Sequence, residues 1–315
     1  MITGTILTVG EILVEIMASE RGEGFREAQP LRGPFPSGAP AIFIDQVGKL
    51  GHPAAIVSAV GDDDFGRLNL DRLAADGVDT GAVAVLKGHA TGSAFVRYRP
   101  DGARDFVFNI RHSASGCIAP TDAAHAAIEA CGHLHIMGSS LSIPAMAEWM
   151  AQAAASVGAR GGKVSFDPNI RKEILDDPRA RHALETVLGH TDLFLPSGDE
   201  LLMLSGQAGV EAAVAHLIGQ GIAEIVLKCG ADGAIHYDRG GATRSPGFAV
   251  TEVDPTGAGD CFGATFVVCR RRGMAVGEAL RYANAAGALA VGAMGPMEGA
   301  STFAELDAFL TARPH

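Results

Sequence analysis

Short apolar segments alternate with helical ones along the second half of the chain, and this alternation restricts the fold more than any other feature. The apolar segments read HLHIM, KVSFD, DLFLP and EIVLKCG, and the helical ones PAMAEWMAQAAASVG, HALETVLGH and EAAVAHLIGQG. Such alternation is typical of βαβ units, in which helices cover both faces of a parallel sheet. TILTVG and AAIVSAVG, earlier in the chain, look like further strands of the same kind. We therefore predict an α/β fold built on one such sheet.

The segment TGSAFVRYRPDGARDFVFNI, residues 91–110, breaks the alternation. Two β-rich runs flank Pro100, Asp101 and Gly102, which have turn chemistry, so a hairpin is predicted. With residues near 12–18 and 31–37 it would form a small sheet beside the main one. Such a sheet can act as a lid over a site, and the alternative is that it only mediates contact in a homodimer.

Residues 253–266, VDPTGAGDCFGATF, place three small residues directly before an acid, Asp260. Apolar residues follow at helical spacing, and the basic residues 270–272 with a glycine after them predict an amphipathic helix that ends there. Residues 257–259 therefore lie at a helix start, where unpaired N–H groups and a partial positive charge attract an anion. The pattern indicates a phosphate-sized site, and the alternative is that Thr256 or Asp260 simply caps or charges the first turn.

The two common phosphate-binding motifs are absent from this sequence. Gly48-Lys49 is followed by Leu50, so there is no GxxxxGK followed by Ser or Thr, and GAGDCF lacks the third glycine of GxGxxG. GAGDCF also lies late in the chain, whereas a dinucleotide fingerprint opens the first βαβ unit. A nicotinamide dehydrogenase on a Rossmann core is therefore a weaker alternative.

The composition argues against several classes of partner. There are 25 Lys and Arg against 36 Asp and Glu, a net charge of −11, and only 6% of the residues are aromatic, so we expect no nucleic-acid binding. With no basic leader and no long apolar run in the sequence, we expect a cytoplasmic protein without a membrane partner.

The five cysteines form no CxxC, which argues against a disulfide framework and a zinc knuckle. The histidines of HLH at 133–135 would point to one face of a strand, where packing is favoured over a metal site.

Two distant signatures carry a resemblance to a known family. DPTGAGDCFGATF is similar to the late signature of the ribokinase-like (PfkB) carbohydrate kinases, and PSGAPAIFIDQVGKLG followed by VGDDDFG resembles their early one. SFDPNIR and GEILVEI are more similar to the ketose and 2-keto-3-deoxygluconate kinase branches than to ribokinase or adenosine kinase. The resemblance runs nearly end to end. It implies a single ribokinase-like kinase domain over residues 1–315, with a three-layer α/β/α core and the small sheet as a sugar lid.

The resemblance implies a catalytic base and an anion hole at the predicted helix start. Asp260 matches the base, and the backbone N–H groups of Gly257, Ala258 and Gly259 match the anion hole. Phosphoryl transfer depends above all on positioning and charge neutralisation, so an acid within reach of a sugar hydroxyl at such a turn suits this chemistry.

ATP and Mg²⁺ are the implied cofactors, with K⁺ in some members of the family. LKCGADG resembles the strand and turn beside the nucleotide, and YANAAGA the region near the adenine. The ATP-side candidates are Lys228, Gly230, Gly233 and Asn284. Lys228 could equally be a surface residue at the end of a strand.

The metal-side candidates rest on weaker matches. Glu200 fits the acid of the family's NxxE motif, which organises Mg²⁺ through water. Ser197 stands where that motif has asparagine, which weakens the assignment. Asp254 and Thr256 match positions that hold a monovalent cation in some members, together with the loop around 291–299.

The sugar side departs from the family more than the ATP side does. Candidates for the sugar are Glu15, Gly38, Asn109, Arg111, Asn169 and Arg171. Arg111 and Arg171 match basic positions of ketoacid kinases, and an arginine suits a carboxylate, a phosphate or a surface ion pair. Ile42 stands where the early signature usually has an asparagine that hydrogen-bonds the sugar, and Ser37 replaces the first of its paired glycines.

We therefore expect a neutral ketohexose, D-tagatose, as the substrate. GPFPSGAPAIFIDQ resembles bacterial tagatose kinases, and Asn109 occupies a place where 2-keto-3-deoxygluconate kinases tend to have tyrosine. A 2-keto-3-deoxygluconate kinase and a fructokinase are the alternatives within the family. The alternative from another class is a non-catalytic sugar-sensing protein, against which the intact Gly-Ala-Gly-Asp argues because a pure binder needs no base.

Overall fold

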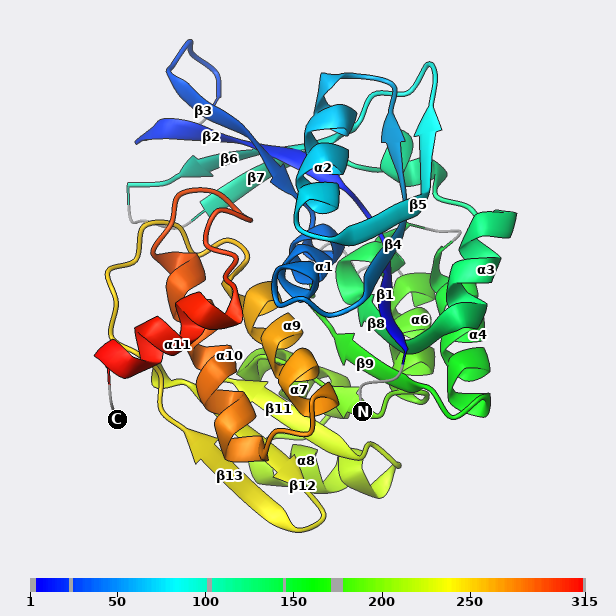
Figure 1. The fold of residues 1–315 in the computed structure, drawn as a ribbon, viewed down its shortest axis with the longest axis vertical. Coiled ribbons are helices and arrows are strands. Elements are labelled where there is room, and N and C mark those ends of the chain that lie inside the picture. The colour runs from blue at the N-terminus through cyan, green and yellow to red at the C-terminus, as the bar shows by residue number, and fades with distance from the viewer. Residues whose placement is uncertain (1–3, 23–24, 101–103, 144–145, 171–177, 314–315) are drawn as a thin grey trace.

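A mixed nine-stranded sheet forms the centre of the computed structural model, which describes residues 4–22, 25–100, 104–143, 146–170 and 178–313. The strand order is β13-β12-β11-β10-β9-β8-β1-β4-β5, and the strands from β11 to β5 are parallel (Figure 1). Their bounds are β1 Thr5–Val9, β4 Ala54–Gly61, β5 Val78–Leu86, β8 Cys131–Met137, β9 Lys163–Asp167, β10 Leu193–Phe194, β11 Glu224–Lys228, β12 Ala234–Asp238 and β13 Gly241–Ser245. The parallel strands predicted from the alternation are all present.

Three strands of this sheet were not predicted: β5 at one edge, and β12 and β13 at the other. β12 and β13 run antiparallel to β11 and extend the sheet at one edge. No helix separates β11 from β12, only a short turn at Gly230–Asp232, so the βαβ pattern could not indicate them. The inner strands are different because helices cover both of their faces, and every residue of β4 is buried.

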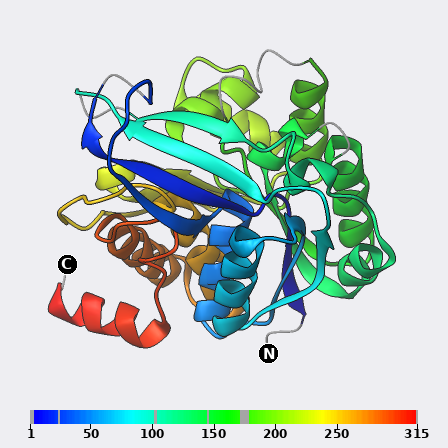
Figure 2. The same cartoon turned by 90° about the horizontal axis from the view of Figure 1, so that it is seen from above.

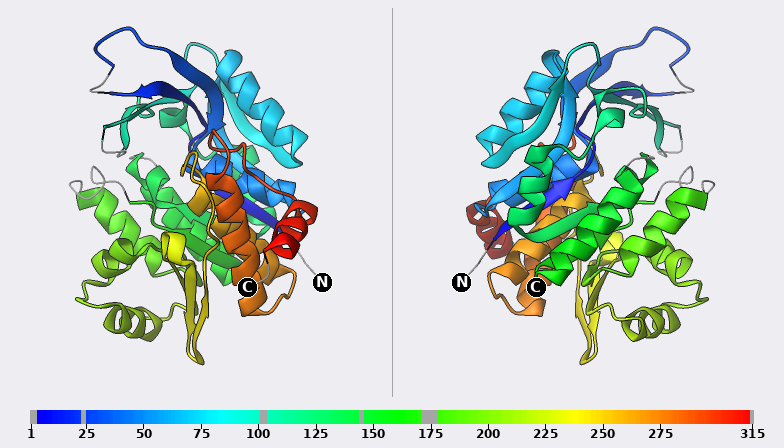
Figure 3. Two further views of the ribbon diagram at one scale, coloured as in Figure 1. Left: turned by 90° about the vertical axis from the view of Figure 1, so that its left-hand side faces the viewer. Right: turned by 90° about the vertical axis from the view of Figure 1, so that its right-hand side faces the viewer.

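Helices cover the two faces of the main sheet in two layers (Figures 1 and 3). One layer holds α1 Ala39–Lys49, α2 Asp64–Ala75, α9 Ala258–Arg271, α10 Val276–Val291 and α11 Phe303–Ala312. The other holds α3 Asp122–Ala130, α4 Met146–Ala159, α6 Pro178–Leu188, α7 Gly198–Ser205 and α8 Val210–Gly219. Each layer buries its own apolar cluster against the sheet, which gives the predicted three-layer α/β/α core.

A second sheet of four strands lies across the end of the core at which the parallel strands finish (Figures 1 and 2). Its order is β3-β2-β6-β7, with β2 Leu13–Arg21, β3 Leu31–Ser37, β6 Gly92–Tyr98 and β7 Arg104–Asn109. β6 and β7 form the predicted hairpin, paired from Ser93 with Asn109 to Tyr98 with Arg104. The predicted turn falls partly outside the described residues, which omit 101–103. β1 leads directly into β2, and β3 leads into α1, so the chain enters and leaves this sheet beside the core.

The longest helix in the described part of the chain is α10, with 16 residues. No single helix of that part of the chain is long and apolar enough to cross a bilayer. The helices α7 and α8, bent by 55° at the break between them, meet the criterion of length and composition only as a pair.

Two buried histidines link neighbouring strands in the core. His133 and His135 lie on β8 and point to the same face, as predicted, where His133 Nε2 and His135 Nδ1 each lie 2.7 Å from Ser165 Oγ of β9. The His135 ring stacks on Phe43 of α1, with ring centroids 3.5 Å apart. Burial lowers the pKa of His133 to about 3, helped by the nearby Arg271, and lowers that of His135 well below its usual value. Both rings are therefore neutral in the folded protein.

Acid should destabilise the fold through these two rings. In the unfolded chain each histidine takes up a proton below about pH 6.5, whereas the buried rings stay neutral to much lower pH. The unfolded state then binds more protons than the folded state. The free energy of unfolding therefore falls as the pH is lowered from about 6.5, by up to about 1.4 kcal/mol per pH unit for each ring.

We predict that His135→Phe, which keeps a ring against Phe43, roughly halves this contribution to the slope between about pH 4.5 and 6. Urea unfolding at a series of pH values measures it. His125 lies exposed on α3, so His125→Phe is the matched control and should leave the slope unchanged. A His135→Phe slope equal to that of the parent protein would contradict the assignment of a neutral buried ring.

Candidate active site

A cavity of about 780 Å³ lies between the small sheet and the C-terminal ends of the parallel strands. Ligands of parallel α/β sheets bind at this end of the strands. The predicted site residues that line it are Glu15, Gly38, Asn169, Glu200, Thr256, Gly257, Gly259, Asp260 and Lys228. They come from β2, from the residue before α1, from the ends of β9 and β11, from the first turn of α7 and from the start of α9. The fold thus gathers residues that are far apart in the sequence.

A second cavity of about 540 Å³ adjoins the first. Its wall includes the predicted nucleotide-side residues Gly230, Gly233 and Asn284, together with apolar residues such as Phe248. Lys228, Pro255 and Gly259 line both cavities. The two cavities therefore meet at the start of α9, which is the geometry needed to hold two molecules that exchange a group.

The start of α9 depends on a glycine in a left-handed conformation. Gly257 precedes the helix with φ of 82°, and a Cβ there would clash with the backbone oxygen of Pro296. At Gly259 the atom nearest to such a Cβ is Lys228 Nζ, at 3.7 Å. The first N–H groups of a helix have no partner within the helix, and here they lie beside an ammonium group. Asp260 follows in the same turn, half-buried in the wall of the larger cavity.

A buried ion pair joins the ends of β9 and β11. Lys228 Nζ lies 2.5 Å from Asp167 Oδ2, and the Lys228 side chain is 18% exposed. Burial raises the pKa of Asp167 to about 6, against the opposing effect of Lys228. Burial alone would lower the pKa of Lys228, but the carboxylates of Asp167 and Glu200 outweigh it and raise that pKa. Lys228 is therefore a charged group in the site wall, and the alternative of a surface lysine is wrong.

Glu200 is held by donors from two loops. Its Oε2 accepts from the N–H and the hydroxyl of Ser197, at 2.7 and 2.8 Å, and its Oε1 accepts from Ile170 N at 2.8 Å. Ser197 thus precedes α7 as its N-cap, with Glu200 completing a capping box. The described residues hold no group of three or more His, Cys, Asp or Glu side chains that could bind a metal directly. Any Mg²⁺ near Glu200 would need water and phosphate oxygens as its other ligands.

Asp254 fixes the turn that leads into α9. It is fully buried; Oδ1 accepts from the N–H and the hydroxyl of Thr256, at 3.0 and 2.8 Å, and Oδ2 accepts from Gly295 N at 3.1 Å. The small sheet reaches the same turn, because Tyr98 OH donates to Asp254 Oδ1 at 3.4 Å and Arg104 Nη1 donates to Thr256 Oγ1 at 2.7 Å. Burial, then the charge of Asp254, raises the pKa of Tyr98 to about 12. The small sheet is therefore docked on the turn that begins α9.

The nucleotide-side candidates shape the second cavity. Asn284 Nδ2 donates to Ser245 Oγ at 3.1 Å and to Pro246 O at 3.0 Å. Gly233 has φ of 90°, and a Cβ there would clash with the backbone oxygen of Ser245. Both residues thus hold the 245–246 segment against the cavity. Gly230, with φ of 58°, opens the short turn that ends β11.

The sugar-side candidates divide into two groups. Glu15 is buried, with Oε2 accepting from Ser37 Oγ at 3.2 Å, and Gly38 has φ of 109° where a Cβ would clash with the backbone oxygen of Glu11. Asn169 has φ of 37° and lines the larger cavity. All three residues line the larger cavity.

Asn109 and Arg111 do not line the cavity, although both were predicted to bind the sugar. Asn109 ends β7 and is exposed, and its neighbour Phe108 is the residue that lines the cavity. Successive side chains of a strand point to opposite faces, so Asn109 faces away from the cavity. Arg111 follows the strand and is exposed. Arg171 lies outside the described residues.

Several cavity-lining residues were missed from the sequence. Arg99, Arg104, Phe106 and Phe108 come from the β6–β7 hairpin, and Asp167 comes from the end of β9. The alternation of β7 was a usable signal, since Arg104, Phe106 and Phe108 share one face of the strand. Asp167 lies at the end of β9, two residues before Asn169. Its position in the cavity wall depends on the ion pair with Lys228, which is distant in sequence, so no local pattern predicts it.

The comparisons with known proteins agree with this geometry. The family model of the pfkB family carbohydrate kinases matches residues 6–302. A fructokinase of Klebsiella pneumoniae is 32% identical over 93% of this chain and 95% of its own. Fructokinase-1 of Zea mays is 30% identical over 96% of both chains. An E. coli protein described as a "putative Ribokinase II", solved with ATP and Mg²⁺, is 48% identical, with a TM-score of 0.94 over 99% of this chain and 100% of that one. Because the family model and these relatives cover nearly the whole chain, it belongs to the pfkB family of carbohydrate kinases and is an ATP-dependent sugar kinase.

Proposed function

We propose that this kinase phosphorylates the terminal hydroxyl of a ketohexose, with D-tagatose as the preferred sugar. The meeting of the two cavities at the first turn of α9, with Asp260 in the wall of the larger one, is the observation that supports it most. The relatives named fructokinase support a ketohexose as the class of substrate.

Asp260 is the proposed base. Its carboxylate takes the proton of the sugar hydroxyl while that oxygen forms its bond to the γ-phosphorus. The bond between the γ-phosphorus and the oxygen that bridges it to the β-phosphorus breaks, and ADP leaves. The N–H groups of Gly257, Ala258 and Gly259 stabilise the negative charge on the transferred group. Lys228 adds a fixed positive charge at the junction of the cavities, held there by Asp167.

The smaller cavity is the proposed ATP site, with Gly230, Gly233 and Asn284 in its wall. The E. coli protein with ATP and Mg²⁺ supports both cofactors, and a fructokinase of Vibrio cholerae solved with potassium supports a monovalent cation. Mg²⁺ bound with ATP would neutralise phosphate charge, and Glu200 would reach it through water. Asp254 and Thr256 are the proposed neighbours of K⁺.

The choice of D-tagatose over D-fructose rests on Ile42. Its side chain lines the sugar cavity and is buried. An apolar branched group cannot satisfy a sugar hydroxyl, and a hydroxyl buried there without a partner would cost about 1–3 kcal/mol. D-Tagatose is the C4 epimer of D-fructose and differs in the placement of one hydroxyl. Glu15 and Asn169 are the proposed hydroxyl partners.

A sugar-derived keto acid such as 2-keto-3-deoxygluconate is the second candidate substrate, and two arginines favour it. Arg99 and Arg104 both line the sugar cavity, and a carboxylate can accept two parallel hydrogen bonds from a guanidinium. Arg99 also lies 3.4 Å from Asp105, and Arg104 donates to Thr256, so both have protein partners. These partners make the neutral sugar our first choice.

We also propose that the chain works as one kinase domain with the small sheet as its lid. Val107 on the outer face of that sheet is 58% exposed and lies with Phe25, Leu31 and Phe95 around a shallow apolar hollow. A homodimer through this face stays a prediction. Sedimentation equilibrium, which measures the mass of the protein in solution, would test it.

Asp260→Asn should lower kcat by at least about a hundredfold while ATP still binds, because an amide cannot take the hydroxyl proton. A coupled assay for sugar-dependent ADP release measures kcat, and calorimetry measures ATP binding. Asp64, an exposed acid in the first turn of α2, gives the control Asp64→Asn, which should keep full activity. Turnover near that of the parent protein in Asp260→Asn would rule out Asp260 as the base.

Sugar binding should slow amide hydrogen exchange in residues 91–110, because closure of a lid orders it and expels water. Hydrogen exchange with and without sugar measures the effect. Arg104→Gln removes a charged contact with Thr256 and should weaken the protection, whereas Arg97→Gln, which only breaks the pair with Asp105 inside the hairpin, should keep it. Equal exchange in 91–110 with and without sugar would show that the hairpin is not a lid.

Values of kcat/KM for D-tagatose, D-fructose and 2-keto-3-deoxygluconate, under one ATP and Mg²⁺ condition, test the substrate. We expect D-tagatose to give the highest value. Ile42→Asn should shift the preference toward D-fructose because it restores a hydrogen-bonding group. If the ketoacid exceeds D-tagatose by tenfold or more, about 1.4 kcal/mol in transition-state binding, the arginines set the specificity and the tagatose assignment fails.

A further inference from the structure

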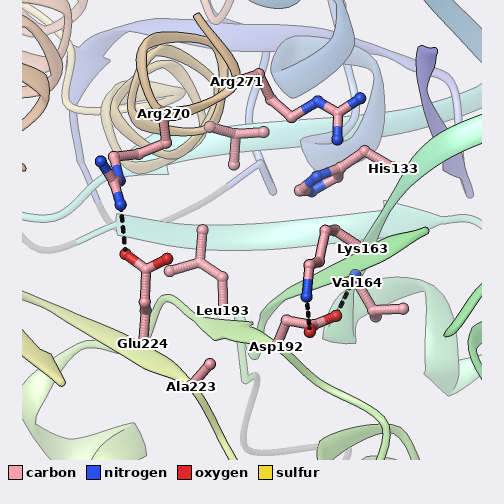
Figure 4. Close-up of a pocket in the computed structure, with 10 residues that line it drawn as sticks. His133, Lys163, Val164, Asp192, Leu193, Ala223, Glu224, Arg270 and Arg271 are labelled. Atoms are coloured by element: carbon pink, nitrogen blue, oxygen red, sulfur yellow. Dashed lines mark hydrogen bonds and ion pairs between the residues drawn. The ribbon is translucent and has the colours of Figure 1, made fainter. Parts of the chain in front are cut away.

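A third cavity, of about 330 Å³, lies where β8, β9, β10 and β11 begin, beneath the last turn of α9 (Figure 4). The substrate cavities lie at the opposite ends of these strands. None of the residues that line the third cavity lines either of the others. Its volume is within the usual range for small-molecule sites, roughly 300–1,000 Å³. The cavity is therefore separate from the kinase site.

The walls of this cavity carry more positive than negative charge. Three cations, Lys163, Arg270 and Arg271, face two carboxylates, Asp192 and Glu224. Lys163 Nζ lies 2.7 Å from Asp192 Oδ1, and Arg270 lies 3.5 Å from Glu224 Oε2. The lining of this cavity is thus net positive, whereas the whole chain has a net charge of −11. Such a cavity favours an anion over a neutral ligand or a cation.

His133 adds a polar atom that no protein group satisfies. The side chain is 4% exposed, Nε2 is bonded to Ser165 Oγ, and Nδ1 is buried with no hydrogen-bond partner in the described part of the chain. Figure 4 shows the ring in the cavity wall between Arg271 and Lys163. A buried polar atom of this kind is costly unless a ligand or a water completes it.

We propose that this cavity binds a small oxyanion of the phosphate class. Arg271 supplies a planar guanidinium suited to two phosphate oxygens, and His133 donates its Nδ1–H to a third. Lys163, which is 58% exposed at the mouth, adds a positive charge that can turn from Asp192 to the ligand. Inorganic phosphate and the phosphoryl group of a small metabolite share this chemistry.

The neighbouring hydrogen bonds allow the required tautomer. When His133 carries its proton on Nδ1, its Nε2 must accept a hydrogen bond from the hydroxyl of Ser165. Ser165 Oγ then accepts from the Nδ1–H of His135, which lies 2.7 Å away. Each hydrogen bond among the three side chains then has one donor and one acceptor, although His135 Nε2 stays buried without a partner among the described residues. An anion at His133 Nδ1 therefore selects one proton pattern along β8 and β9.

The test is a titration with inorganic phosphate of the full-length protein, saturated with Mg²⁺ and a non-hydrolysable ATP analogue so that the kinase site is filled. Calorimetry should show one saturable site. Nitrogen-15 spectra should show His133 moving to the Nδ1–H tautomer as phosphate binds. Arg271→Gln should weaken binding at least tenfold.

Arg272→Gln is the matched control. Arg272 is the next residue and carries the same charge, but it donates to Leu50 O, lies over the Phe303 ring and does not line the cavity. It should bind phosphate like the parent protein. Lys163→Gln changes an exposed side chain and should also weaken phosphate binding. If Arg271→Gln does not fold, Lys163→Gln takes its place in the comparison with Arg272→Gln.

Two results would overturn the proposal: no saturable binding below about 10 mM phosphate, or equal binding by Arg271→Gln and Arg272→Gln. A parallel titration with glycerol phosphate separates the two sources of the anion. Tighter binding of the ester supports a phosphorylated metabolite, and tighter binding of phosphate supports the free ion.

Discussion

The position of the α9 start governs the arrangement of both substrate cavities. The turn before the helix is fixed by Asp254, whose two carboxylate oxygens hold Thr256 on one side and Gly295 on the other. Gly257 then approaches the backbone of Pro296 so closely that no side chain fits. Because Gly259 and Lys228 lie in the walls of both cavities, a shift of this turn would change the shape of both cavities together.

Charge in the site is balanced by buried pairs and not by solvent. Lys228 and Asp167 are held together at the ends of two strands, and Glu200 adds to the field that keeps the lysine protonated. A lone ammonium group in this place would lose its charge, because burial favours the neutral form. The carboxylates therefore keep a fixed cation beside the helix start, where phosphate charge would accumulate, and such a preorganised cation need not reorient during phosphoryl transfer.

Local pattern predicts the elements of this fold, and long-range contact decides the details of the site. Strands β1, β4, β8, β9, β10 and β11 and the hairpin follow from apolar runs and turn residues, whereas β5 was not predicted. The alternation of side chains along β7 would also have predicted that Arg104, Phe106 and Phe108 share one face of the strand and that Asn109 lies on the other. No local signal reveals that Asp167 pairs with Lys228, that Arg104 reaches Thr256, or that β12 and β13 extend the sheet, because each depends on residues that meet only after folding.

The contact between Arg104 and Thr256 gives the small sheet an effect beyond lining the larger cavity. Thr256 belongs to the turn that Asp254 fixes, and Tyr98 bonds to Asp254 itself, so the docked hairpin and the start of α9 share one hydrogen-bond network. A hairpin that moved away would leave the buried Asp254 with fewer donors. The position of the small sheet and the geometry of the turn before α9 are therefore energetically coupled, which suits an enzyme that must exclude water before it transfers a phosphoryl group.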